Sequence, residues 1–399
     1  MLRTPIYLDN FSTTRVDPRV VDAMLPFFTE TFGNAGSTSH SFGWEAKAAV
    51  DEARQTIGAA IGASPREIVF TSGATESNNL ALKGTVERQR KRGNHIVSAG
   101  TEHKSILDPL TRLGRRGCEI SFVPVTPNGD AHAGLIDVQR VEDALRPDTI
   151  LVSIMLANNE IGVIQPIAEL GALCKRRGIW LHTDATQAVG KIEVNVEQLQ
   201  IDLLSFTAHK IYGPKGVGAL YIRRREPNVR LEPLLDGGGQ EGGARSGTLN
   251  VAGIVGFARA IELCIAEMPS ESRRLIELRQ RLFDGLRSAT ADVTLNGPTL
   301  DVPGLRLPGN LNCSFAYVDG EALMMSMRDV AVSSGSACTS ANPEPSHVLR
   351  AIGLSDDLTK ASLRFGIGRF NTAEEIDIAI QAVAEAVRRL RAMSSMANQ

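Results

Sequence analysis

The sequence has no basic excess and no long apolar run. Its 399 residues contain 43 Lys and Arg against 45 Asp and Glu, which leaves a net charge of −2. Proteins that bind nucleic acid usually carry a basic excess, so we expect no direct contact with nucleic acid. No apolar run approaches the ~18 residues that a membrane span needs, and residues 1–9 have no apolar signal core. These absences predict a cytoplasmic protein with no membrane partner.

Cysteine is also scarce. The five cysteines stand far apart, at positions 118, 174, 264, 313 and 338. Their odd number and wide spacing exclude a disulfide framework and a Cys-x-x-Cys zinc site, and favour a reducing compartment. The remaining composition is ordinary for a globular protein, with 43% hydrophobic and 22% charged residues. At ~100–200 residues per domain, the length predicts two or three domains.

Short apolar runs alternate with amphipathic stretches through the middle of the chain. Most runs are nearly continuous in Ile, Val, Leu and Phe, as strands buried on both faces are. Helical patterns separate many of them, such as Leu80–Arg92 and Ile167–Arg177, which we expect to close at Gly93 and Gly178. The alternation predicts an α/β fold with a mostly parallel seven-stranded sheet and helices on both faces. The expected strands are Ile68–Thr71, His95–Ser98, Glu119–Val123, Thr149–Met155, Ile179–Thr183, Leu203–Phe206 and Val217–Ile222.

The pattern changes after about residue 260. A long charged helix is expected over about 262–289, followed by shorter strands at Asn310–Phe315, Val330–Ser333 and Ser362–Phe365. A capping box formed by Thr372 and Glu375 precedes a last helix with one apolar stripe. We therefore predict a large domain over 15–260, and a smaller α+β domain formed by 1–14 and 261–399.

Two segments at strand ends are suited to binding a charged ligand. Thr71–Glu76 follows a strand and opens a helix, so its backbone N–H groups and hydroxyl suit an anion, although an ordinary strand-to-helix turn has the same pattern. Asp184 ends an apolar strand at the sheet edge where ligands bind. Its carboxylate suits a positively charged ring nitrogen, while a helix cap or a structural ion pair is the commoner role for a single Asp.

Two further residues carry nucleophiles. Lys210 lies just past another strand, beside Thr207 and His209, where a partly buried amine suits a Schiff base; most isolated lysines are simply solvated. Cys338 lies among small polar residues, as a reactive thiol on an exposed loop does, and the other cysteines fall within strand or helix patterns that predict burial.

Histidine spacing offers a weaker, competing site. His182, Asp184 and His209 could together supply three metal ligands, but no His-Glu-x-x-His or similar spacing supports a metal. A phosphate-binding turn, an Asp at a strand end and a lysine past a later strand instead fit one cofactor, pyridoxal 5'-phosphate. We expect no permanent metal.

Six motifs carry a resemblance to a known family. The sequence resembles the cysteine desulfurases of the NifS/IscS type, in the class-V aminotransferases of pyridoxal-phosphate fold type I, over nearly the whole chain. The last motif is similar to the active-site loop of the NifS/IscS group. The motifs are Glu67–Ser77 (EIVFTSGATES), Asn158–Gly162, His182–Gln187, His209–Gly216, Arg245–Thr248 and Ser333–Cys338.

The resemblance implies a role for each matching residue. Lys210 would form the Schiff base and move the proton at the substrate α-carbon, His103 would stack on the ring as an acid and base, and Cys338 would take the sulfur. Arg364, with Asn159, would bind the substrate carboxylate. The cofactor would be held by Ala74, Thr75, His103, Asn159, Asp184, Gln187, Thr207, His209 and Lys210, and by Thr248 from the neighbouring subunit of a homodimer.

The implied reaction converts L-cysteine into L-alanine and a persulfide on Cys338. An acceptor protein, such as an iron–sulfur scaffold, would receive that sulfur for cluster assembly or thiolation, and Cys338 would be a candidate transient cluster ligand at that interface. A selenocysteine lyase or a related aminotransferase on the same fold stays the alternative. Two departures from the family bear on the partners: Gly242 stands where arginine is common, and the tail after the last helix is short.

Overall fold

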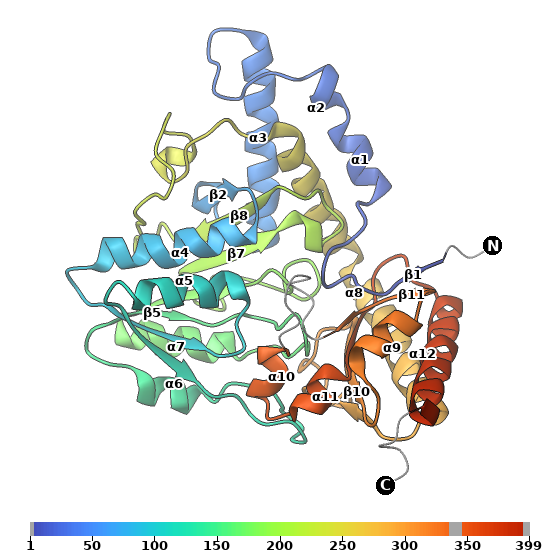
Figure 1. Ribbon diagram of the computed structural model, residues 1–399. Helices are drawn as coiled ribbons and strands as arrows, with labels where there is room; N and C mark the ends of the chain where they lie inside the picture. The colour runs from blue at the N-terminus through green and yellow to red at the C-terminus, as the bar shows by residue number, and fades with distance from the viewer. Residues whose placement is uncertain (1–3, 335–344, 394–399) are drawn as a thin grey trace.

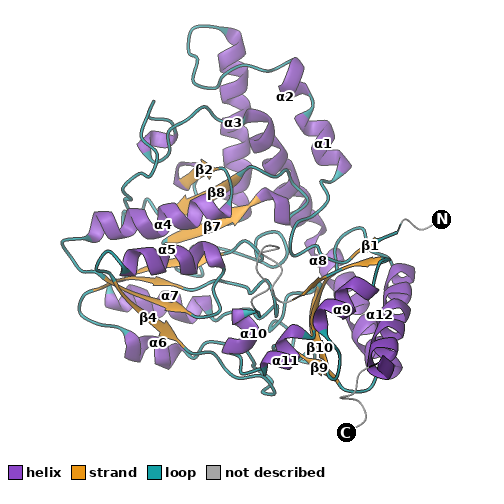
Figure 2. Ribbon diagram, in the orientation of Figure 1, coloured by secondary structure: helices purple, strands orange, loops and turns teal. Residues whose placement is uncertain are grey.

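The computed structural model describes residues 4–334 and 345–393. A seven-stranded sheet lies at the centre of its larger part, in the order β2-β8-β7-β6-β5-β3-β4 (Figures 1 and 2). Within this sheet β8 runs antiparallel to both its neighbours, so the predicted mostly parallel sheet is confirmed. The strands are β2 (Ile68–Thr71), β3 (His95–Ala99), β4 (Glu119–Val123), β5 (Thr149–Ser153), β6 (Trp180–Asp184), β7 (Leu203–Thr207) and β8 (Gly218–Ile222).

Helices cover both faces of this sheet because its strands alternate apolar side chains between the faces. Ile68 and Phe70 of β2 join one core with α3, α7 and α8, while Val69 joins another with α4 and α5. The helices of this part are α1 (Pro18–Met24), α2 (Pro26–Thr29), α3 (Ser41–Ala60), α4 (Ala74–Gln89), α5 (Lys104–Gly114), α6 (Val138–Ala144), α7 (Ile167–Arg177) and α8 (Val251–Ala289), with short 3-10 turns η1 (Pro65–Glu67), η2 (Ala208–Lys210) and η3 (Glu241–Gly243).

The helix ends confirm one glycine prediction and correct another. Helix α7 has the predicted bounds, and Gly178 caps it in the left-handed conformation at φ 63°. Helix α4 begins at Ala74, six residues before the predicted start, and ends at Gln89. Gly93 is not a left-handed cap. A Cβ on Gly93 would lie 2.1 Å from the carbonyl oxygen of Asp148, so glycine is needed there for a close backbone approach.

A smaller antiparallel sheet, in the order β12-β13-β10-β9, lies beside the larger part. The predicted strand Val330–Ser333 is two short strands, because β11 pairs with β1 whereas β12 pairs with β13. The predicted capping box is confirmed, since Thr372 and Glu375 exchange side-chain-to-backbone hydrogen bonds of 3.2 Å. The elements are β1 (Ile6–Tyr7), β9 (Val293–Leu295), β10 (Asn310–Phe315), β11 (Val330–Ala331), β12 (Ser333–Ser334), β13 (Ser362–Gly366), α9 (Gly320–Ser326), α10 (His347–Ala351), α11 (Asp356–Lys360) and α12 (Ala373–Met393).

Helix α8 connects the two parts. Its 39 residues span about 58 Å at 1.5 Å per residue. Phe257 and Ile261 lie in the core of the large sheet, whereas Leu282 and Leu286 lie in a separate core with the small sheet. The helix begins before the predicted residue 262 and runs through the expected domain boundary at 260, which stays a prediction. None of the described helices has both the length and the apolar character to cross a membrane.

Candidate functional site

A cavity of about 570 Å³ lies at the carboxyl ends of the parallel strands of the large sheet. Arg364 of the small sheet also lines this cavity. Parallel strands present such ligand sites at this edge. The cavity brings together all the predicted site residues except Thr248 and Cys338. These are Ala74, Thr75, His103, Asn159, Asp184, Gln187, Thr207, His209, Lys210 and Arg364.

Lys210 projects its amine into this cavity from η2, immediately after β7. Its Nζ donates to the carbonyl oxygens of Phe11 at 2.6 Å and of Ser12 at 2.5 Å. Both carbonyls belong to the N-terminal segment, which crosses from β1 to the large part. The two bonds fix the position of the amine at the cavity that it lines.

Asp184 and His103 both line the cavity. Asp184 is only 5% exposed, and its carboxylate accepts hydrogen bonds from Asn78 Nδ2 at 2.7 Å and from the Thr186 backbone N–H at 2.9 Å. His103 caps α5, where its Nδ1 accepts from the Ser105 N–H at 3.1 Å. Burial lowers the pKa of His103, so a neutral ring with its proton on Nε2 faces the cavity at neutral pH.

The first turn of α4 also lines the cavity. Its N-cap, Gly73, provides no side-chain cap, so the N–H groups of Ala74 and Thr75 suit an anion at a helix N-terminus. Thr207 and His209 line the same cavity, and a Cβ on Gly73 would lie 3.8 Å from Thr207 Oγ1. Burial lowers the pKa of His209 to about 4, and its Nδ1 lies 3.1 Å from Thr13 Oγ1. His209 therefore acts there as a neutral hydrogen-bonding group.

Arg364 of β13 reaches the cavity from the small sheet. Its side chain donates to Asp9 Oδ1 at 2.9 Å, to Ser12 Oγ at 2.6 Å and to the Asn159 carbonyl at 3.3 Å. The residue is only 2% exposed, and its Nε has no hydrogen-bond partner among the described residues. A buried guanidinium with a spare donor suits a ligand carboxylate.

Two predicted residues are not brought to the cavity. Thr248 is exposed and lies outside the lining, and its expected contact comes from a neighbouring subunit, which stays a prediction. Cys338 lies outside the described residues. Gly242 is exposed, at φ 63°, next to Glu241, whose carboxylate accepts from Arg54 at 2.7 and 2.6 Å.

Sequence reasoning missed the contribution of the N-terminal segment. Phe11 and Ser12 contact Lys210 through backbone carbonyls, and a carbonyl leaves no side-chain signal. Asn78, which holds Asp184, lies within the fully helical stretch of α4. Asn78 is a buried polar residue one turn after Thr75, and this position near the predicted phosphate turn was the available signal for a role in the site.

The metal alternative lacks its ligands. His182 uses both ring nitrogens, at 2.9 Å from Ser153 Oγ and 3.0 Å from Ser205 Oγ. Across residues 4–334 and 345–393, no group of three or more His, Cys, Asp or Glu side chains is arranged to hold a metal ion. His182 is therefore a core residue of β6 whose ring bonds to the two neighbouring strands, β5 and β7.

Glu160 follows Asn159 in the chain and is buried, and its burial predicts a pH effect on stability. Its Oε2 accepts a 2.5 Å hydrogen bond from Ser346 Oγ, and burial raises its pKa from 4.5 to about 7. The folded state then binds more protons than the unfolded state between these values, so this group lowers stability as the pH rises from about 4.5 to 7.

Glu160→Gln is expected to remove that loss because the amide oxygen keeps the Ser346 bond without a charge. The free energy of unfolding should rise by about 1–3 kcal/mol at pH 8 and stay unchanged at pH 4. Urea unfolding at both pH values measures this. Glu169→Gln, a change on the exposed face of α7, is the control, and an equal gain at both pH values would contradict the explanation.

The chain is similar to known proteins over nearly its whole length. The family model described as "Aminotransferase class-V" matches residues 6–378. A "Cysteine desulfurase IscS" of Anaeromyxobacter dehalogenans is 55% identical over 99% of this chain and 95% of its own. A human "Cysteine desulfurase" is 51% identical over 98% of this chain and 84% of its own. The solved structure of a "NIFS-LIKE PROTEIN" superimposes with a TM-score of 0.88 at 37% identity, covering 97% of this chain and 100% of that one.

Proposed function

We infer that this chain, which belongs to the class-V aminotransferase family, is a cysteine desulfurase that removes the sulfur of L-cysteine. Relatives named for that activity share half or more of its residues over nearly its whole length. The observation that carries the proposal is a single cavity holding the Lys210 amine, the Asp184 carboxylate and the buried Arg364 guanidinium.

The residues of this cavity fit pyridoxal 5'-phosphate, the cofactor of this family. The N–H groups at the start of α4, with Thr207 and His209, suit its phosphate. Asp184, with both oxygens fixed by hydrogen bonds, suits a protonated ring nitrogen, and Asn159 and Gln187 suit the ring oxygen. When bound, the cofactor would withdraw electrons from the substrate α-carbon.

Lys210 and Arg364 would then act on the substrate itself. Arg364, held by Asp9 and Ser12, would bind the carboxylate and orient the α-carbon toward Lys210. The Lys210 amine would take the α-proton and return it during turnover. His103, neutral with its proton on Nε2, would stack on the cofactor ring and donate or accept a proton there.

Cys338 would receive the sulfur. Its thiolate would attack the substrate sulfur, forming an S–S bond while the C–S bond breaks, and the released electron pair would take a proton to give the methyl group of L-alanine. Ser333 pairs with Arg364 across β12 and β13. Cys338 is four residues beyond Ser334, which extended chain spans in at most about 14 Å, so its position in the chain agrees with this role.

We propose that the acceptor is a protein, such as an iron–sulfur scaffold, that takes the persulfide sulfur from Cys338. The relative named IscS and the reducing, cytoplasmic setting expected from the scattered cysteines support this partner. A transient role of Cys338 as a cluster ligand belongs to the same hand-over. A scaffold complex whose iron signal is unchanged by Cys338→Ala would argue against that role.

The function is tested by L-alanine formation from L-cysteine, measured with the holoenzyme and a thiol reductant. We expect alanine and sulfide in equal amounts. Selenocysteine supplied in parallel distinguishes the alternative: turnover of selenocysteine alone would indicate a lyase for that substrate. Transfer of the amino group to a keto acid, without sulfide, would indicate an aminotransferase. No product from any of them with the cofactor bound would overturn the proposal.

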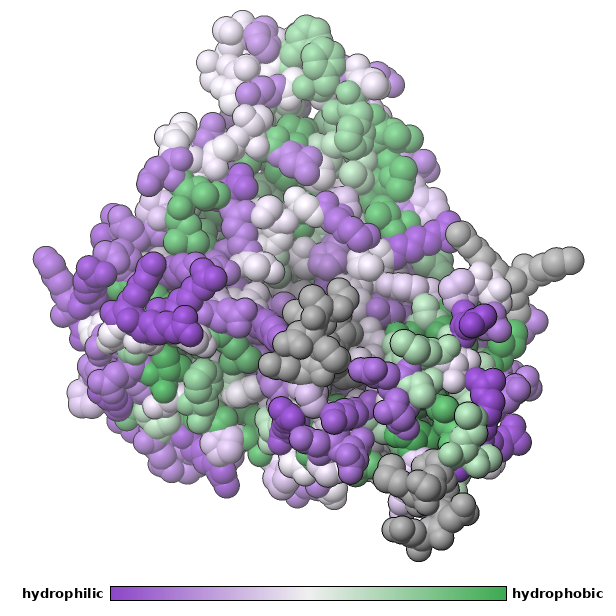
Figure 3. Space-filling model, viewed as in Figure 1, coloured by the Kyte–Doolittle hydropathy of each residue, from purple (hydrophilic) through white to green (hydrophobic). Residues whose placement is uncertain are grey.

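We propose a homodimer formed through the face of α1, α2 and the start of α3. Apolar side chains gather over this part of the surface (Figure 3). They are more than half exposed at Leu25, Phe28, Phe32 and Trp44, and nearly so at Phe42. Burying such side chains is worth about 1.5–3 kcal/mol each. The dimer would also place Thr248 of one subunit at the site of the other.

Replacing Phe28 and Phe32 together by Asp is expected to weaken the dimer by at least about a hundredfold. Sedimentation velocity across a dilution series measures this. Met325→Asp on α9, where the native side chain is 77% exposed, is the matched control away from this face. A dimer that survives the double change with unaltered dissociation would place the interface elsewhere.

A further inference from the structure

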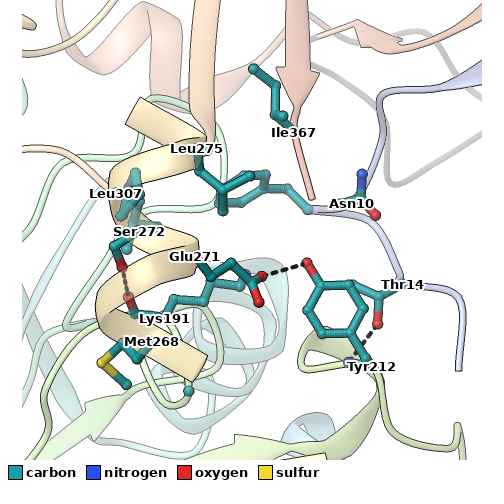
Figure 4. A pocket seen from close by; sticks show the side chains of 14 residues that line it. Asn10, Thr14, Lys191, Tyr212, Met268, Glu271, Ser272, Leu275, Leu307 and Ile367 are labelled. Carbon is teal, nitrogen blue, oxygen red and sulfur yellow. Dashed lines mark hydrogen bonds between the residues drawn. The ribbon is translucent and has the colours of Figure 1, made fainter. Parts of the chain in front are cut away.

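A second, smaller cavity of about 30 Å³, called the rear cavity below, lies between the two parts of the molecule and shares Phe11 with the catalytic cavity. Figure 4 shows it between α8 and the segment carrying Asn10 and Thr14, with Lys191 beside Ser272 and Glu271 of α8. Lys191 lines this rear cavity and does not line the catalytic one. Lys191 has no part in the proposed sulfur removal.

Lys191 nevertheless contacts a residue of the catalytic cavity. Its Nζ donates to Gln187 Oε1 at 2.5 Å and lies 4.4 Å from the centre of the Phe11 ring. Gln187, only 3% exposed, donates through Nε2 to the Phe11 carbonyl at 2.9 Å. The same carbonyl accepts from Lys210. A chain of three contacts therefore runs from Lys191 to the catalytic lysine.

The two partners of Gln187 permit one orientation of its amide. The Lys191 amine is a donor and the Phe11 carbonyl is an acceptor, so the amide oxygen must face Lys191 and the amide nitrogen must face Phe11. An amide nitrogen carries two hydrogens, and Phe11 uses one. The other is free to be donated within the catalytic cavity that Gln187 lines.

We propose that Lys191 is a positioning residue that orients Gln187 from behind, so that an amide N–H is presented to the ring oxygen of the bound cofactor. This inference rests on the proposed function. Burial, and then the charge of Lys210, lower the pKa of Lys191 to about 7. Arg364 acts in the same direction, whereas Cys264 and Glu271 of α8 oppose it. The amine donates N–H bonds in either protonation state, so the orientation persists across neutral pH.

The test is equilibrium binding of pyridoxal 5'-phosphate to the apoenzyme. Binding is monitored through the visible absorbance that depends on Lys210. Lys191→Met removes the donor and keeps the apolar stem. It should raise the dissociation constant by about tenfold, and Lys191→Arg should restore it. Gln187→Leu should cause a similar loss, and the double variant should bind no more weakly than Gln187→Leu alone.

Non-additivity separates orientation from packing, because a Lys191 that only fills space would multiply the two losses. If Lys191→Met does not fold, Lys191→Gln takes its place: with an N–H donor retained, it should keep the affinity, and a loss equal to that of Gln187→Leu would overturn the inference. If the losses of the two single variants multiply in the double variant while the wild type shows its normal spectrum, the inference about Lys191 is overturned and the proposed function stands. A wild type without the Lys210-dependent band would remove the proposed function and the inference together.

Discussion

Cys338→Ala is expected to lower L-alanine formation by at least about a thousandfold, because it removes the proposed nucleophile for the substrate sulfur. Without a thiolate to form the S–S bond, the substrate C–S bond has no route to break toward alanine. The bound cofactor should keep its absorbance, since none of the cavity residues changes. Stopped assays of alanine with L-cysteine and a thiol reductant measure the effect.

Cys118→Ala provides the control for that experiment. Cys118 is half-buried while Cys174, Cys264 and Cys313 are buried, so it is the most accessible thiol of the described part. Burial raises the pKa of the Cys118 thiol, which leaves it a poor nucleophile. The control should retain full activity. Alanine formation by Cys338→Ala at the wild-type rate would mean that sulfur leaves without an enzyme persulfide.

Lys210→Arg is expected to lower turnover by a similar factor, at least about a thousandfold. Arginine keeps a positive charge near the Phe11 and Ser12 carbonyls that hold the native amine. It cannot lose its proton at any working pH, so it neither bonds to the cofactor nor accepts the substrate α-proton. A charge-preserving change thus separates the chemistry of the amine from its electrostatic effect.

Exchange of the substrate α-hydrogen in deuterated water measures the missing step directly. The wild type should exchange it during turnover, and Lys210→Arg should not. Lys175→Arg, on the exposed end of α7, is the matched control. Exchange that continues in Lys210→Arg would assign the proton transfer to another group, with His103 a candidate in the same cavity.

The strands were predictable because their burial is visible in the residues. Ile68–Thr71 and Asn310–Phe315 have the predicted bounds, the first as a continuous apolar run and the second as an alternation of polar and apolar residues. The start of α8 was missed because Val251–Ile261 is apolar nearly all round, as a helix buried in the core is. The charged pattern begins only where one face meets solvent.

The candidate site was predictable where side chains at strand ends carry it. Asp184 ends one apolar strand and Lys210 lies three residues past the end of the next, so the topology alone brings them to one edge. Three other features depend on tertiary contacts. The Phe11 and Ser12 carbonyls have no sequence signal, and the raised pKa of Glu160 follows from burial. The contact of Lys191 with Gln187 orients the amide only because Gln187 also donates to the Phe11 carbonyl.

The N-terminal segment has a consequence for synthesis of the chain. Ile6 pairs with Val330, and the backbone N–H of Asn10 donates to the carbonyl of Gly366. Both partners are translated more than 300 residues later, on the order of tens of seconds at ribosomal rates. Throughout that interval the carbonyls that hold Lys210 lack their final anchorage. A nascent chain therefore completes its catalytic cavity only after β13 has left the ribosome, and stalled or truncated products would not retain cofactor.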